Sequence, residues 1–438
     1  MNINLKDINF NIDTESDFMI NAPKLENRVV KEQKPSVNKD VETPIIDMHS
    51  IIEKINNIKN DMNNLFVNRK HIIDDMFLAI VSKQHMVMIG EPGVGKSALV
   101  NDLTSRIVKG NVFSWQLNKT TDPSEIFGPF SIKSMENDSF ARKTDGTLVD
   151  AHIAYLDEVF KANSAVLNSL LQTMNERTFN NDGQVVKCPL ISIFASSNEW
   201  GDDSNLEAFT DRFIFKHHIK YLNNKDLKKL IMLKINGTKP KFQDKISLEE
   251  IEFLQENVKL VSIPKNVIDI FLDCISLLKR IGISVSDRKA VQCLDILKAC
   301  ALLNERYECE LSDLEFLVNV LWDGKGNISD VKDSIDQSIF PLKKEYDSIA
   351  KDMNRIITEY SKIENNVEKN NYISRELQIV KALETKAINI KASIDKKSND
   401  IIKFDELVNK INDFYNYLIN AISTSSYEDF KKKDFLIK

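Results

Sequence analysis

The chain has 438 residues, of which 42% are hydrophobic and 28% are charged, and its formal net charge is −6 at pH 7. This length predicts two or three domains with sizeable cores, and the mildly acidic balance gives no global reason to expect nucleic-acid binding. The five cysteines include no Cys-x-x-Cys pair, which favours buried free thiols in a reducing compartment. Since no apolar run approaches the roughly 18 residues of a membrane span, and the N-terminus lacks a signal-peptide core, we expect a cytoplasmic protein.

The N-terminal part predicts an arm followed by two helices. Residues 1–45 are polar and contain several prolines, a composition typical of a flexible arm. Apolar residues then recur at helical spacing over residues 48–65, and again over residues 72–80.

The next segment, Gly90–Ser97, has the sequence Gly-Glu-Pro-Gly-Val-Gly-Lys-Ser and fits the phosphate-binding pattern G-x-x-x-x-G-K-[ST]. An apolar run at 86–89 predicts a buried strand before it, and residues 98–103 predict a helix after it. The glycines allow a tight turn that directs backbone N–H groups at phosphates, and the N-terminus of the helix favours an anion. Lys96 would reach the β- and γ-phosphates, and the Ser97 hydroxyl would bind Mg²⁺.

The phosphate loop defines the predicted cofactor-binding residues, which are Gly90, Glu91, Pro92, Gly93, Val94, Gly95, Lys96, Ser97 and Ala98. Val67 lies in the link between the two upstream helices and is the expected apolar contact for an adenine ring. Plain helix packing is an equally good interpretation of Val67.

A second strand is predicted over residues 113–117, and a helix should begin at Asp122-Pro123-Ser124 and end at Gly128-Pro129. Residues 130–150 are polar, and we expect an exposed, irregular insertion there.

A buried strand over 153–156 ends in Asp157 and Glu158. An apolar strand that delivers two acids at its carboxyl end is the second half of a nucleotide site. Asp157 would bind Mg²⁺, mainly through water, and Glu158 would polarise the attacking water.

The pattern then predicts a helix over 161–176, a β-hairpin over 178–187 and a fourth strand over 190–195. Asn198 follows that strand, where its amide could bond both the γ-phosphate and the attacking water; the alternative role is that of a turn residue. A fifth strand is predicted over 214–219.

From residue 224 the pattern is helical throughout. Strands alternating with helices and then helices alone predict an α/β domain with a parallel sheet, followed by an α-helical domain. In that second domain Ser286 should cap a helix that carries Arg288, and the last helix should cover residues 313–322.

The last hundred residues contain apolar positions at heptad spacing, from Leu342 to Val367 and again from Leu377 to Ile394, and a third helix is predicted over 404–422. With a turn at 365–371, this predicts an antiparallel coiled-coil hairpin. A compact helical bundle is the alternative.

Taken together, the sequence resembles the MoxR group of AAA+ ATPases, and is most similar to its regulatory ATPase variant (RavA) branch. The resemblance covers about residues 50–325. Besides the phosphate loop it is carried by residues 125–129, 156–165, 175–179, 195–199, 211–212, 286–288 and 321–322.

The resemblance implies an AAA+ core over 46–222 and a helical lid over 223–328, and the heptad spacing adds a C-terminal helical hairpin or coiled coil over 329–438. It assigns Asn198 as the first sensor, Arg212 as an arginine finger acting on the neighbouring subunit's nucleotide, and Arg288 as the second sensor, reaching the γ-phosphate from the lid. It implies ATP and Mg²⁺ as cofactors and a homo-hexameric ring. It also implies that the ring remodels a client or a partner with a von Willebrand factor A domain.

Departures from the group leave other functions open. Residues 330–438 match no motif of the RavA branch, and Lys289 stands where an Arg is common. A nucleic-acid motor is the first alternative, but the local basic residues Lys187, Lys133, Arg142 and Lys143 are sparse. A nucleotide-gated assembly scaffold is the second. A GTPase is disfavoured because no N-K-x-D motif occurs, and a zinc enzyme because no H-E-x-x-H motif occurs.

Overall fold

The computed structural model describes residues 47–201, 204–237, 244–324, 326–394, 400–424 and 430–437. The predicted arm over 1–45 therefore lies outside the described residues. Within the described part, no helix has both the length and the apolar character that crossing a membrane requires.

Five parallel strands form the central sheet, in the order β3-β4-β7-β1-β8. Their bounds are β1 (Met86–Gly90), β3 (Val112–Gln116), β4 (Ile153–Asp157), β7 (Ser192–Ser197) and β8 (Phe215–Ile219). All five predicted strands are present, with ends shifted by one or two residues. Since the strands are parallel, their carboxyl ends share one edge of the sheet.

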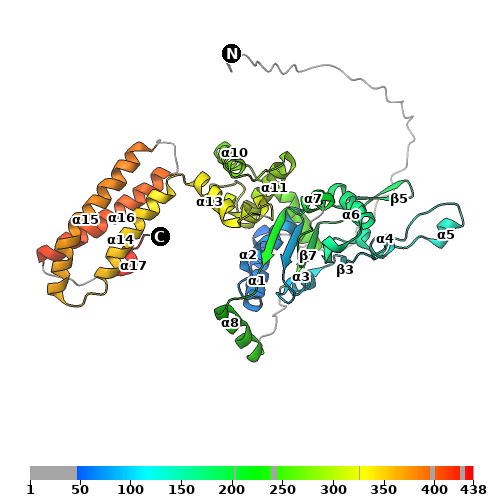
Figure 1. Cartoon of the computed structure of the whole chain (residues 1–438), viewed down its shortest axis with the longest axis horizontal. Coiled ribbons are helices and arrows are strands. Elements are labelled where there is room, and N and C mark those ends of the chain that lie inside the picture. Colours follow the sequence, from blue (N-terminus) through cyan, green and yellow to red (C-terminus); the bar gives the residue numbers. More distant parts are fainter. Residues whose placement is uncertain are drawn as a thin grey trace, which may run out of the picture. The chain divides into compact units, whose positions relative to one another are not determined.

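Helices cover both faces of this sheet (Figure 1). Alternate strand residues point to opposite faces, so Met86 and Met88 belong to one core and Val87 and Ile89 to the other. The first core is covered by α1 (Met48–Leu65), α2 (Lys70–Val81) and α3 (Lys96–Ser105). The second is covered by α4 (Pro123–Phe127), α6 (Ser164–Glu176) and α7 (Ser204–Thr210). Burial on both faces explains why the central strands are apolar throughout.

The start of α4 confirms the predicted helix boundary. Asp122 and Glu125 form a reciprocal capping box, and Gly128 ends the helix with φ 93°.

The insertion over 130–150 is more regular than expected. It contains α5 (Ile132–Met135) and a 3₁₀ turn, η1 (Leu148–Asp150), that buries Leu148 and Val149. The predicted hairpin, formed by β5 (Thr178–Asn181) and β6 (Gln184–Lys187), is hydrogen-bonded to this insertion. The Asn181 side chain accepts from the Arg142 N–H at 2.7 Å and donates to the Arg142 carbonyl at 3.1 Å. The prediction of an irregular insertion was therefore wrong at these places. Side-chain hydrogen bonds to the hairpin order this segment, and the sequence of residues 130–150 carries no local pattern that would reveal them.

The predicted helical domain follows β8. Its elements are α8 (Asn224–Ile235), α9 (Leu248–Val258), α10 (Lys265–Arg280), α11 (Asp287–Leu303), η3 (Leu311–Leu317), α12 (Val318–Leu321) and α13 (Ile328–Ile339). A short parallel pair, β2 (Ile107–Val108) with β9 (Ile246–Ser247), ties it to the sheet domain. The helix α13 lies beyond the expected lid end at 328, yet it buries Val331 and Ile335 in the same core as α10 and α11.

The C-terminal region is a helical bundle. It comprises α14 (Lys343–Tyr360), α15 (Asn366–Ser393), α16 (Asp400–Thr424) and the short α17 (Lys432–Phe435), around one core. The three long helices pack against one another, so the bundle alternative is correct and the two-helix coiled coil is not. The turn lies at 361–365 rather than 365–371, and Val367, which the heptad pattern placed in the seam, is exposed.

The turn at Gly128 provides a stability test. A Cβ at this position would lie 1.8 Å from the Lys143 carbonyl oxygen, whereas a Cβ at Gly146, which also has positive φ, would meet nothing within 4 Å. We expect Gly128→Ala to lower the free energy of unfolding by about 2–4 kcal/mol, because the clash adds to the left-handed strain. Gly146→Ala should cost about 1 kcal/mol.

Urea unfolding followed by circular dichroism would measure both variants. Equal losses at the two positions would contradict a close packing of the insertion base against Gly128.

Candidate nucleotide site

The phosphate loop turns between β1 and α3. Gly93 and Gly95 have φ of 82° and 91°, a conformation that glycine adopts without strain, and α3 begins directly at Lys96. This places the N-terminal N–H groups of a ten-residue helix at the loop, where they favour a phosphate.

The Lys96 side chain is already directed into the loop. It is only 7% exposed, and its Nζ donates to the carbonyl oxygen of Gly90 and to Asn198 Oδ1 at 2.9 Å. Burial lowers the pKa of Lys96, and the charges of Asp157 and Glu158 oppose that shift. A buried ammonium whose hydrogen bonds, among the described residues, go to neutral oxygens suits an incoming anion such as a phosphate.

The two acids lie at the carboxyl end of β4, as predicted. Glu158 has φ 53°, a left-handed conformation uncommon for this residue type, and its N–H donates to Asp157 Oδ1 at 3.0 Å. Asn198 Nδ2 donates to Glu158 Oε1 at 2.6 Å, while the Lys161 ammonium lies 3.1 Å from Glu158 Oε2. Asn198 thus links Lys96 to Glu158, and three predicted site residues meet at one point.

Two residues of this site were missed by the sequence analysis. The Tyr155 hydroxyl donates to Ser97 Oγ at 2.9 Å and lies 2.8 Å from Ser196 Oγ, and the Ser196 hydroxyl donates to Asp157 Oδ1. Burial raises the pKa of Tyr155, so the phenol stays protonated and available for hydrogen bonding. The signal in the sequence was the spacing of Tyr155 and Asp157, which places both on one face of the strand.

Ser97 and Asp157 therefore lie at the two ends of one row of closely spaced oxygen atoms that runs through Tyr155 and Ser196. A hydroxyl and a carboxylate are hard oxygen ligands of the kind that Mg²⁺ prefers, so the donor set fits the predicted metal. The described residues contain no cluster of three or more His, Cys, Asp or Glu side chains able to hold a metal by themselves. Such a site would need phosphate oxygens or water to complete the coordination.

Val67 lies in the short link between α1 and α2, close to the loop. Arg69 in this link donates to the Lys220 carbonyl at 2.9 Å, and the hydroxyl of the next residue, Tyr221, donates to the Pro92 carbonyl at 3.2 Å. The Val67 side chain is 4% exposed, as the packing interpretation expects. Its contact with adenine stays a prediction.

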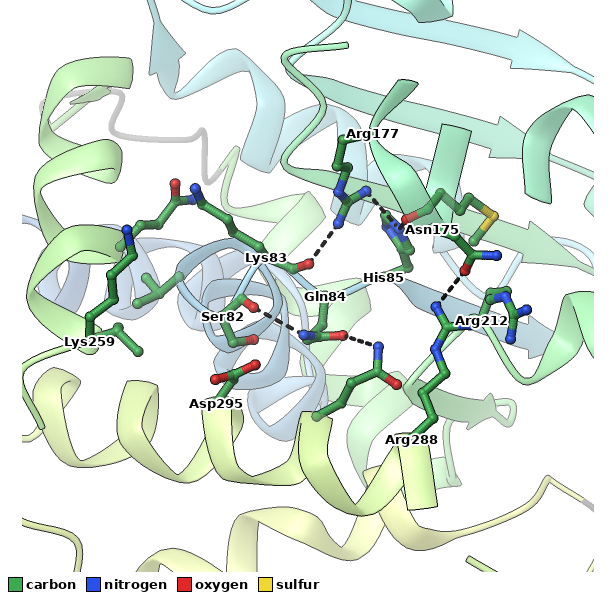
Figure 2. Close-up of a pocket in the computed structure, with 15 residues that line it drawn as sticks. Ser82, Lys83, Gln84, His85, Asn175, Arg177, Arg212, Lys259, Arg288 and Asp295 are labelled. Atoms are coloured by element: carbon green, nitrogen blue, oxygen red, sulfur yellow. Dashed lines mark hydrogen bonds between the residues drawn. The ribbon is translucent and has the colours of Figure 1, made fainter. Parts of the chain in front are cut away.

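Arg212 and Arg288 lie elsewhere, at the amino edge of the sheet. Arg212 lies three residues before the start of β8, and Arg288 is in the first turn of α11, whose N-cap is Ser286 as predicted. Figure 2 shows both side chains along one cavity of about 370 Å³, and none of residues 90–98 is among the residues that line it. A five-residue strand is about 15 Å long, which separates this cavity from the phosphate loop of the same chain.

The cavity is strongly cationic. Arg288 donates to Asn175 Oδ1 at 2.5 Å, and within the described residues the buried Nε of Arg212 has no hydrogen-bond partner. Burial and the nearby charge of Arg288 lower the pKa of Arg212. An anion entering the cavity would meet two guanidinium groups that form no salt bridge with a carboxylate among the described residues.

Arg177 has a structural role in the same wall. It adopts φ 52°, donates to the Lys83 carbonyl at 2.7 Å, and lies with its guanidinium 2.8 Å from His85 Nε2. Burial lowers the pKa of Arg177 to about 10, and burial together with the Arg177 charge lowers the pKa of His85 well below its usual value. The neutral His85 accepts from the Ile193 N–H through Nδ1 at 2.9 Å. Together with the bond from Arg177 to the Lys83 carbonyl, this holds the end of α6 beside the start of β1.

Comparison with known proteins agrees with this architecture. Residues 53–256 match a family described as the MoxR domain in the MoxR-vWA-beta-propeller ternary systems, and residues 266–335 match an AAA lid domain. A crystal structure of a putative ATPase from Cytophaga hutchinsonii is similar in fold, with a TM-score of 0.50 and 20% identity over 61% of this chain and 84% of that one.

Two curated sequences extend the comparison. MJ0079 of Methanocaldococcus jannaschii is 36% identical over 85% of this chain and 98% of its own length, a match that must continue beyond residue 335 into the C-terminal helices. Chaperone MoxR1 of Mycobacterium tuberculosis is 26% identical over 45% of this chain and 52% of its own length. The matched domains, their order and the sheet that carries the phosphate loop and acid pair lead to one conclusion: the chain belongs to the MoxR-type family of AAA+ ATPases.

Proposed function

We propose that this protein is an ATP-hydrolysing ring ATPase that remodels a partner protein, with each nucleotide site built from two neighbouring subunits. The observation that carries this proposal is the division of the predicted site residues between two edges. The phosphate loop, the acid pair and Asn198 lie at the carboxyl edge, whereas Arg212 and Arg288 lie at the amino edge.

The residues at the carboxyl edge account for binding and for the attack of water. Lys96 and the N-terminus of α3 would hold the phosphates, and Ser97 and Asp157 would hold Mg²⁺, which offsets phosphate charge when bound. Glu158 Oε1 and Asn198 would orient the attacking water, and Glu158 would accept its proton. Asn198 bridges Lys96 and Glu158, so binding of a γ-phosphate to Lys96 would free the amide to turn toward water.

The residues at the amino edge account for assembly. Arg212 and Arg288 cannot reach the phosphate loop of their own chain across the sheet, so we assign both to the nucleotide of the neighbouring subunit. We therefore keep the expectation that Arg288 acts from the lid, but we propose that it acts on the nucleotide of the neighbouring subunit. A guanidinium in trans stabilises charge that develops in the transition state, and it couples turnover to assembly. The oligomer expected from the family resemblance is a hexamer.

The partner is proposed from the family description. The matched domain occurs in systems with von Willebrand factor A and β-propeller proteins, and we assign a von Willebrand factor A domain partner to this chain. Assignment to the RavA branch remains a proposal of the same kind.

Glu158→Gln tests the role of the acid pair. The amide keeps the size and the hydrogen-bonding position of the carboxylate but cannot accept a proton, so ATP binding and assembly should persist while hydrolysis falls by at least about 100-fold. Phosphate release and the binding of a fluorescent ATP analogue measure the two effects. The variant held in ATP should also co-purify a von Willebrand factor A domain protein. Normal hydrolysis would show that the acid-pair assignment is wrong.

Tyr155→Phe tests the link between Ser97 and Asp157. Loss of the hydroxyl removes about 1 kcal/mol of hydrogen bonding around the predicted Mg²⁺ ligands, so the Mg²⁺ concentration for half-maximal activity should rise about fivefold with little change in kcat. The matched control is Tyr307→Phe, because the Tyr307 hydroxyl donates to Met48 Sδ and contacts none of the predicted Mg²⁺ ligands. An unchanged Mg²⁺ requirement would contradict a metal at Ser97 and Asp157.

Mixing of variants tests sites shared between subunits. Arg212→Ala and Arg288→Ala should each lose about 10³-fold in turnover. Addition of Glu158→Gln subunits, which are inactive themselves but carry both arginines, should restore activity, because a mixed pair contains one complete site. Rescue of Arg212→Ala but not of Arg288→Ala would assign Arg288 to its own chain, and no rescue of either would contradict sites shared between subunits.

A further inference from the structure

Helix α8 has twelve residues and none of them is buried, whereas the other described helices without a buried residue, α5 and α17, have only four. Its apolar residues Leu227, Ile231 and Ile235 follow one another at intervals of four and are 43%, 50% and 71% exposed. Residues at this spacing form one stripe along a helix. A contiguous apolar stripe on an exposed helix marks a contact surface, because the same residues in a monomer would stay in water.

The helix also needs a partner for its own stability. Isolated helices of twelve residues are marginal in water, and in proteins most of their stability comes from packing of an apolar face. The apolar stripe of α8 has no such packing within the described residues.

The start of α8 is fixed at the nucleotide edge. Asn223 caps the helix by accepting from the Asp226 N–H at 2.9 Å, and Asn68 in the α1–α2 link donates to Asp226 Oδ2 at 3.2 Å. Tyr221, just before the helix, donates to Pro92 of the phosphate loop at 3.2 Å. A neighbouring subunit that brings Arg212 and Arg288 to this edge would therefore approach the surface on which α8 begins.

The surface around Arg288 carries the complementary pattern. On α11, Asp287, Val291 and Asp295 are spaced by four residues and are all exposed, so an apolar residue lies between two acids. Ile281, in the link that leads into α11, is 50% exposed. Figure 2 shows Asp295 and Arg288 on the helix that borders the cationic cavity.

The charges of α8 match the two acids of the α11 stripe, although Lys279 and Arg280 beside Ile281 are also exposed. The apolar stripe is flanked by exposed lysines, Lys228, Lys229 and Lys234, whereas the α11 stripe carries acids. Two different, complementary surfaces on one chain form a heterologous contact, which builds a ring when the rotation between neighbouring copies closes.

We propose that α8 is the docking helix of the ring, and that its Leu227, Ile231 and Ile235 stripe packs against Ile281 and Val291 of a second copy of this chain. The inference rests on the proposed function, since the same contact delivers the neighbour's Arg288 to the phosphate loop. The occupant is the neighbouring subunit and not a client protein.

Ile231→Asp tests this inference in the Glu158→Gln background, which holds ATP. Light scattering with Mg²⁺ and ATP should show a rise of at least tenfold in the protein concentration needed for half-assembly, because a charge is buried in an apolar contact. Circular dichroism and the unfolding midpoint should stay as in the parent, since Ile231 makes no buried contact in the monomer. The matched control is Ile402→Asp on α16, also an exposed isoleucine, which should assemble normally.

Disulfide trapping tests the contact directly. All five native cysteines are buried, so new surface thiols react selectively. The double variant Ile231→Cys with Val291→Cys should form a ladder extending beyond dimers on a non-reducing gel after oxidation with Mg²⁺ and ATP. Each single variant should give dimers at most. The double variant Ile231→Cys with Ile402→Cys is the control, and it should also give no species larger than a dimer.

These experiments distinguish a failure of the proposed ring ATPase from a failure of the proposed docking role of α8. A Glu158→Gln parent that stays monomeric with ATP would overturn the ring and the docking helix together. A parent that assembles, with an Ile231→Asp variant that assembles at the same concentration, would overturn the docking role of α8 and leave the proposed ATPase intact. Normal assembly of Ile231→Asp combined with loss of partner binding would assign the stripe to a client instead.

Discussion

Parallel pairing of five strands is the constraint on which the rest of this structure depends. It directs every strand's carboxyl end to one edge, so residues more than a hundred positions apart, such as Lys96 and Asn198, meet within 2.9 Å. It also sends the segments that precede the strands to the opposite edge, where Arg212 is found. One architectural rule thus builds a phosphate site at one edge and a cationic cavity at the other.

A single helix connects the two edges. The acid pair is followed by a short 3₁₀ turn in which Lys161 contacts Glu158, and α6 then begins at its cap, Asn163. The helix has 13 residues, a length of about 20 Å, and it carries Asn175 to the side chain of Arg288. The residue that contacts the predicted catalytic carboxylate and the residue that holds Arg288 therefore belong to one nearly continuous rigid segment.

Much of the fold and half of the site could be predicted from the sequence because they depend on local patterns. The strands are short apolar runs, the Asp122 and Ser286 caps are local hydrogen bonds, and the loop from Gly90 to Ser97 is a contiguous motif. The bonds of Tyr155 and Ser196 escaped prediction because they depend on the register between β4 and β7.

The errors likewise have physical causes. The heptad pattern across residues 342–367 indicated one long helix, but the chain turns after Tyr360 and Asn365 caps the next helix by accepting from the Val367 N–H at 2.8 Å. Apolar spacing alone cannot distinguish one helix from two that continue the same period. The position of Arg288 relative to the phosphate loop depends on how the lid packs on the sheet domain, a tertiary arrangement that no motif encodes.

The most direct test of the central claim is an electron cryomicroscopy structure of the Glu158→Gln protein assembled with Mg²⁺ and ATP. We expect the γ-phosphate to lie at Lys96 of one subunit, with the Arg212 and Arg288 guanidinium groups of the neighbouring subunit within hydrogen-bond distance. An assembly in which the γ-phosphate is contacted by Arg288 of its own chain, or in which both arginines of the neighbour lie away from it, would contradict the account.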